Sequence, residues 1–63
     1  SEELDQLIAE ANKQIVVWDT KTSPGTSGEF KRHQVLAALM KKYPKVPNRD
    51  VAIAIELAIQ GMR

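Results

Sequence analysis

Apolar residues near the start of the chain recur at helical spacing. Five of them are separated by three or four positions: Leu4, Ile8, Ala11, Ile15 and Trp18. This spacing places them on one face of a helix. Ser1 can cap the amino end, and the acidic residues that follow it lie where the helix dipole favours negative charge. The pattern predicts a first helix over about residues 2–18.

The end of this segment has a second interpretation. Ile15, Val16 and Val17 form a β-branched run that precedes Trp18, and such a run suits a strand better than a helix. A short strand over residues 14–20 is therefore an alternative to the last turns of the helix.

A polar segment over residues 19–26 separates the first helix from the second. It holds no apolar residue and contains Pro24 and Gly25, a pair typical of a turn. Thr26 and Glu29 have the spacing of a capping box, which predicts the start of a second helix. That helix covers about residues 27–43 and ends before Pro44, which has no backbone donor.

A third helix is predicted over about residues 49–60, with Asn48 as its cap and Gly61 just past its end. Val51, Ala54, Ile55, Ala58 and Met62 point one way at a 3.6-residue period, yet apolar residues cover almost the whole circumference. Two short partner helices can hardly cover such a helix. We therefore expect a homo-oligomer whose interface includes Val51, Ile53, Ile55, Leu57 and Ile59.

These elements predict one all-α domain over residues 1–63, a bundle of three short helices. The polar loop over 19–26 and a Pro-bounded turn over 44–48 connect them. Because that turn is short, we expect the second and third helices to form the tightest pair.

Composition adds limits to this picture. A chain of 63 residues without cysteine has a thin core and no disulfide or thiolate site to reinforce it. Its net charge of +1 is uninformative, but from Phe30 to Arg49 all the charged residues are basic. No apolar run approaches the roughly 20 residues that span a bilayer. We expect no membrane insertion and a cytoplasmic location.

The residues needed for catalysis are scarce. His33 is the single histidine, and Glu29 lies one turn before it. Such a pair is more often a solvated ion pair than a base with its orienting group. No cluster of histidine, cysteine or carboxylate residues supports a metal site. We therefore expect a protein that is not an enzyme and has no cofactor or metal.

A partner-binding surface is expected where the polar loop meets the second helix. Trp18 and Phe30 can anchor a partner there, and Lys31 and Arg32 supply positive charge. An unidentified protein partner fits this surface better than nucleic acid, because the isoelectric point near 8.1 is low for a nucleic-acid-binding domain.

A family resemblance covers residues 18–60. It is carried by Trp18, Gly28-Glu29, Lys31, Val35-Leu36, Leu39, Lys42-Tyr43-Pro44, Val46, Asp50-Val51, Ile55-Glu56 and Ala58-Ile59. This pattern resembles the soluble carboxy-terminal segment of small phage holins of the LLH type. The resemblance implies phage or prophage origin and a compact helical tail that oligomerises. It does not imply pore formation, since those proteins have an amino-terminal membrane helix where this chain has an acidic amphipathic segment.

A second resemblance depends on the strand alternative. A strand over residues 14–20 followed by two helices is similar to a ribbon-helix-helix repressor, which places a β-ribbon in the major groove. The outward residues of such a ribbon, however, are not the polar, basic set that reads base edges. We therefore expect a non-enzymatic protein-interaction or assembly module, with a small DNA-binding regulator as the alternative.

Overall fold

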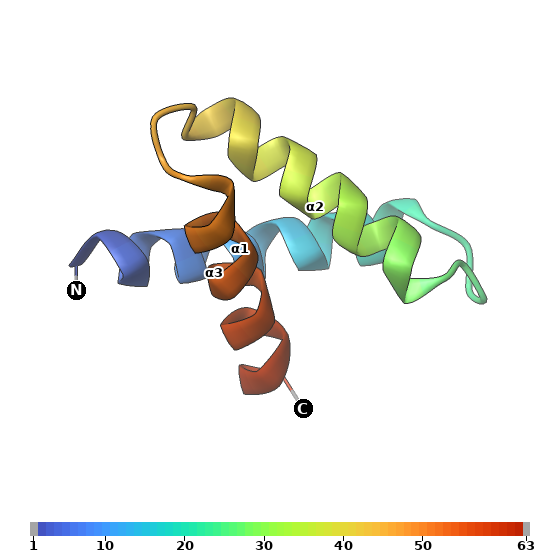
Figure 1. The fold of residues 1–63 in the computed structure, drawn as a ribbon. Coiled ribbons are helices and arrows are strands. Elements are labelled where there is room, and N and C mark those ends of the chain that lie inside the picture. The colour runs from blue at the N-terminus through green and yellow to red at the C-terminus, as the bar shows by residue number, and fades with distance from the viewer. Residues whose placement is uncertain (1, 63) are drawn as a thin grey trace.

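Three α-helices joined by two short connections make up the part of the chain that the structure, a computed structural model, describes: residues 2–62 (Figure 1). α1 spans Glu2–Lys21, α2 spans Gly28–Lys42 and α3 spans Asn48–Gly61. The prediction of an all-α three-helix bundle is confirmed. The predicted cap at Ser1 lies outside the described residues.

α1 is one continuous helix that runs three residues beyond the predicted end. The strand alternative for residues 14–20 is therefore wrong. Ile15 packs against the core, and such tertiary packing overrides a weak β preference. At the end of α1, the hydroxyls of Thr20 and Thr22 donate to the carbonyls of Val17 and Trp18, each at 2.7 Å. These bonds continue the helix into the segment predicted as loop.

The core lies where the three helices meet. Its fully buried side chains are apolar: Leu7, Ala11, Val35, Leu39, Val51, Ala54, Ile55 and Ala58. The face predicted for α3 is confirmed for its four helical members, whereas Met62 lies past the helix end and is exposed. α3 crosses α1 in Figure 1, and three of the buried residues on these two helices are alanines, which allow helices to approach closely.

α1 is the helix that the other two share. Its contact with α3 is the most extensive of the three helix pairs, and the contact between α2 and α3 is the least. The expectation that α2 and α3 form the tightest pair is therefore wrong. A short connection keeps two helices near each other, but the extent of their contact depends on the apolar faces, and those of α2 and α3 both turn towards α1.

The start of α2 differs from the prediction by one residue. The Oγ of Ser27 accepts a hydrogen bond from the backbone N–H of Phe30 at 3.1 Å, so Ser27 is the cap and the capping box at Thr26 is wrong. The N–H of Thr26 donates instead to the carbonyl of Ser23 at 3.1 Å. Gly25 has a φ of +94° within this turn, as the third residue of a type II turn requires.

The start of α3 also differs from the prediction. Pro47 is the residue before the helix, and Asn48 is already helical. The carbonyl of Pro47 accepts from the N–H groups of Asp50 and Val51, at 3.0 and 3.2 Å. The helix has no side-chain cap, so the capping role predicted for Asn48 is wrong. The rigid proline supplies the turn without it.

Candidate functional site

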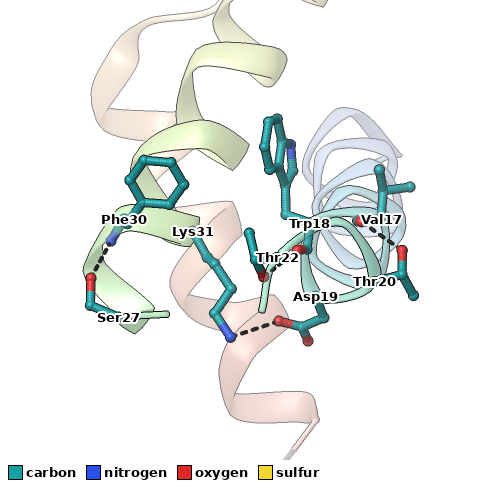
Figure 2. A network of polar contacts seen from close by, with 8 residues as sticks. All are labelled: Val17, Trp18, Asp19, Thr20, Thr22, Ser27, Phe30 and Lys31. Atoms are coloured by element: carbon teal, nitrogen blue, oxygen red, sulfur yellow. Dashed lines mark hydrogen bonds and ion pairs between the residues drawn. The ribbon is translucent and has the colours of Figure 1, made fainter. Parts of the chain in front are cut away.

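Three of the four predicted partner-binding residues, Trp18, Phe30 and Lys31, lie near the connection between α1 and α2 (Figure 2). Trp18 packs against the core from the end of α1, and the ammonium group of Lys21 lies 5.2 Å from the centre of its ring. Phe30 extends from the first turn of α2 and is 48% exposed. Phe30 is therefore more exposed to solvent than Trp18.

The two cations predicted to meet a partner are both paired within the chain. Lys31 on α2 forms an ion pair of 3.0 Å with Asp19 on α1, which Figure 2 shows. Arg32, the next residue, forms an ion pair with Glu56 on α3. Each pair joins α2 to a different helix. These charges therefore hold α2 in place, and a partner would have to compete with Asp19 and Glu56 to use them.

The connection between α1 and α2 is shorter than predicted. Because α1 continues to Lys21, the connection covers only residues 22–27. Six residues are ordinary for two packed helices. Loop length therefore gives no reason to assign a binding role to this segment.

An apolar groove lies beside the paired cations. Its apolar lining comes from Ile15, Val35, Ile55 and Ile59, one or two from each helix, and its volume is about 200 Å³. Lys31 and Asp19 also line it, so their ion pair stands at its edge. The groove extends the core to the surface, since Val35 and Ile55 are themselves core residues.

A third ion pair fixes the other end of α2. The ammonium group of Lys42 donates to Oε1 of Glu10 at 2.8 Å, and the side-chain amide of Gln14 donates to Oε2 at 3.0 Å. These two hydrogen bonds lower the pKa of Glu10 below its ordinary value, and the bond from Gln14 has a larger effect than the bond from Lys42. The same bond to Glu10 raises the pKa of Lys42.

The residues predicted for an oligomer interface separate into two groups. Val51 and Ile55 are 0% and 1% exposed, and Ile59 is partly buried against the core. Ile53 and Leu57 are 46% and 40% exposed. Since Val51 and Ile55 complete the core of one chain, a second copy can reach only the outward pair. We refer to Ile53 and Leu57 as the α3 stripe.

A notch adjoins the α3 stripe where the first turns of α1 and α3 come together. It is lined by Glu3, Leu4, Leu7, Asp50 and Ile53 and has a volume of about 280 Å³. Sequence reasoning missed this notch, because it placed Leu4 on the apolar face of the first helix and gave the residues around it no separate role. The available signal was Ile53, which lies off the core-facing side of α3.

Metal binding, an acid–base pair and a membrane span are the other features at issue in residues 2–62. Residues 2–62 contain no group of three or more side chains placed to hold a metal ion. His33 is exposed on α2, and within the described part of the chain no hydrogen bond joins it to Glu29. None of the helices in residues 2–62 is long and apolar enough to cross a membrane.

No protein-family model, curated protein or solved structure matches this chain.

Proposed function

We propose that this chain is a non-enzymatic protein-interaction module that self-associates through α3. The observation that carries the proposal is the α3 stripe: two large aliphatic side chains, one helical turn apart, each with 40% or more of its surface exposed. Single exposed apolar residues are common. Two neighbours on one helix face, beside a notch that Leu4 and Leu7 also line, form the kind of surface that protein partners cover.

The chemistry of the surface supports an interaction role over catalysis. The titratable side chains that come together do so as opposite charges on two helices, at Lys31 with Asp19, Arg32 with Glu56 and Lys42 with Glu10. Such pairs hold helices together. A catalytic site needs instead a nucleophile or base that a third group orients towards an open pocket.

DNA binding receives less support from the same contacts. Three of the six cations between Phe30 and Arg49 are paired with carboxylates, and residues 14–20 are helical, so the β-ribbon is absent. The cations that have no carboxylate partner supply too little positive charge for a typical nucleic-acid-binding surface. The proposal includes phage or prophage origin, which is supported by the resemblance to the soluble segment of LLH-type holins.

Sedimentation equilibrium of the wild-type chain tests the proposal. We expect an assembly larger than the 7.0 kDa chain at high micromolar concentration. Leu57→Ser removes an apolar contact from the α3 stripe and should weaken the assembly. The matched control is Val16→Ser, because Val16 is 52% exposed on α1 and lies on the helix face opposite the core. A wild-type chain that stays monomeric contradicts the proposal.

A further inference from the structure

We infer that two copies pack with their α3 helices parallel, about a two-fold axis, so that Arg49 of each copy enters the notch of the other. This inference rests on the proposed self-association through the α3 stripe. It names the partner as a second copy of this chain and assigns the notch as the place where an arginine of that copy binds.

Arg49 and Asp50 lie on opposite edges of the α3 stripe. Successive residues of an α-helix are rotated by roughly 100°. Viewed down the helix axis, Arg49 therefore lies beside Ile53 on the side away from Leu57, and Asp50 lies beside Leu57 on the other side. The edge with Asp50 faces α1, since Asp50 lines the notch together with Glu3 and Leu4. The edge with Arg49 faces α2, because it also carries Glu56, the partner of Arg32 on α2.

A parallel two-fold arrangement brings unlike edges together at the same height along the helices. Arg49 of one copy then meets Asp50 and Glu3 of the other, and the same contact forms a second time by symmetry. In an antiparallel arrangement, Arg49 would instead lie beside Gln60 at the far end of the other α3, away from both carboxylates. Charge complementarity therefore favours the parallel arrangement.

The notch has the chemistry that an arginine side chain requires. Leu4, Leu7 and Ile53 give it an apolar lining, and Glu3 and Asp50 add two carboxylates. The aliphatic stem of an arginine packs on such a lining while its guanidinium pairs with the acids. Glu3, Arg49 and Asp50 are exposed, and within residues 2–62 none of them forms an ion pair.

A second copy fits this surface better than an unrelated protein because the surface is self-complementary. The apolar stripe, Arg49 on one edge and Asp50 on the other belong to one face of α3, and Glu3 of α1 lies beside Asp50 in the notch. A two-fold axis satisfies both edges at once, as isologous interfaces require.

A charge exchange between copies tests the arrangement. Arg49→Asp gives a chain with acids on both edges of the stripe, and Asp50→Arg gives a chain with a cation on each edge, next to the remaining Glu3. Each variant alone should self-associate roughly tenfold more weakly than wild type, because two attractive contacts become repulsive. Mixed in equal amounts, with one of them isotope-labelled, they should form mainly mixed dimers in native mass spectrometry. Circular dichroism of each variant checks that the helices remain.

Each outcome has a separate meaning. Preferential mixed dimers, together with weakened single variants, support the parallel arrangement. Variants that dimerise as wild type does, or that mix at random, overturn it, and the self-association proposal then survives if Leu57→Ser still weakens the wild-type dimer. Lys41→Glu is the control, since Lys41 is exposed on α2 and should leave the dimer unchanged. A monomeric wild-type chain overturns both proposals.

Discussion

Glu10 and Lys42 stand 32 positions apart, and a hydrogen bond of 2.8 Å joins the ammonium group of Lys42 to the carboxylate of Glu10. The bond ties the last turn of α2 to the middle of α1. Since Gln14 binds the second carboxylate oxygen, Glu10 has a fixed partner for each of its oxygens. The ionised form of Glu10 is therefore part of the folded structure.

This arrangement predicts a loss of stability in acid. Folding lowers the pKa of Glu10 below its ordinary value of 4.5. The stabilisation is therefore complete above pH 4.5 and is lost as the pH falls through the lower, folded value. Urea denaturation between about pH 6 and about pH 3 should show the free energy of unfolding falling.

Glu10→Gln isolates the contribution of this residue. The variant keeps the side-chain shape but cannot ionise, so it should be less stable at neutral pH and less sensitive to acid than wild type. Glu29→Gln is the control, since Glu29 is exposed and forms no ion pair within residues 2–62. Equal acid sensitivity in wild type and Glu10→Gln would contradict the role of the pair.

The cap of α2 gives a second prediction. Ser27→Ala removes the acceptor for the N–H of Phe30 and should cost about 1 kcal/mol. Thr26→Ala keeps the backbone bond from residue 26 to Ser23 and should cost clearly less. Thermal denaturation of the two variants checks the order, and the reverse order would restore the capping box at Thr26.

Gly25, within the first connection, and Gly28, directly after it, should respond in opposite directions to substitution. Gly25 has a φ of +94°, a conformation that costs an L-residue roughly 1–2 kcal/mol, so Gly25→Ala should destabilise the fold. Gly28 is the first residue of α2, and a Cβ there would meet open space. Gly28→Ala should therefore stabilise the fold by about 0.4–1 kcal/mol. Urea denaturation measures the free energy of unfolding of both variants. A Gly25→Ala variant that is as stable as wild type would contradict the turn geometry described here.

The core offers the largest expected effect. Leu39 on α2 is fully buried, and Leu39→Ala should cost about 2–5 kcal/mol. A chain of this size is rarely more stable than roughly 3–5 kcal/mol, so the variant should be largely unfolded at 25 °C by circular dichroism. The exposed substitution Leu57→Ala should change the stability of the monomer by less than about 0.5 kcal/mol. A folded Leu39→Ala chain would mean that the core is not organised around this residue.

The helices and the buried face of α3 were predictable because the spacing of apolar residues along the chain indicates which side of a helix is buried. The end of α1 was not, since its last turn depends on hydroxyl-to-carbonyl bonds at Thr20 and Thr22 and on tertiary packing of Ile15. The cap of α2 was misplaced by one residue because two neighbouring hydroxyl residues, Thr26 and Ser27, compete for it, and the Ser23–Thr26 turn decides between them.

The candidate surfaces were harder to predict than the fold. Lys31 and Arg32 were recognisable as a local positive charge, but their partners Asp19 and Glu56 lie on other helices, and nothing in local sequence pairs them. Val51 and Ile55 were assigned to an interface because α3 is apolar almost all round. Only the packing of α1 across α3 separates its inner side from Ile53 and Leu57.

The central position of α1 has a consequence for the order in which this chain is made and folds. A ribosome releases α1 first, and its apolar face finds its main partner only in α3, the last helix. While synthesis continues, Leu7 and Ala11 remain without the cover that α3 gives them. α1 and α2 also contact each other, so these two helices can pair before α3 is made. We expect the complete core to form only when α3 is present, because Ala54, Ile55 and Ala58 belong to it.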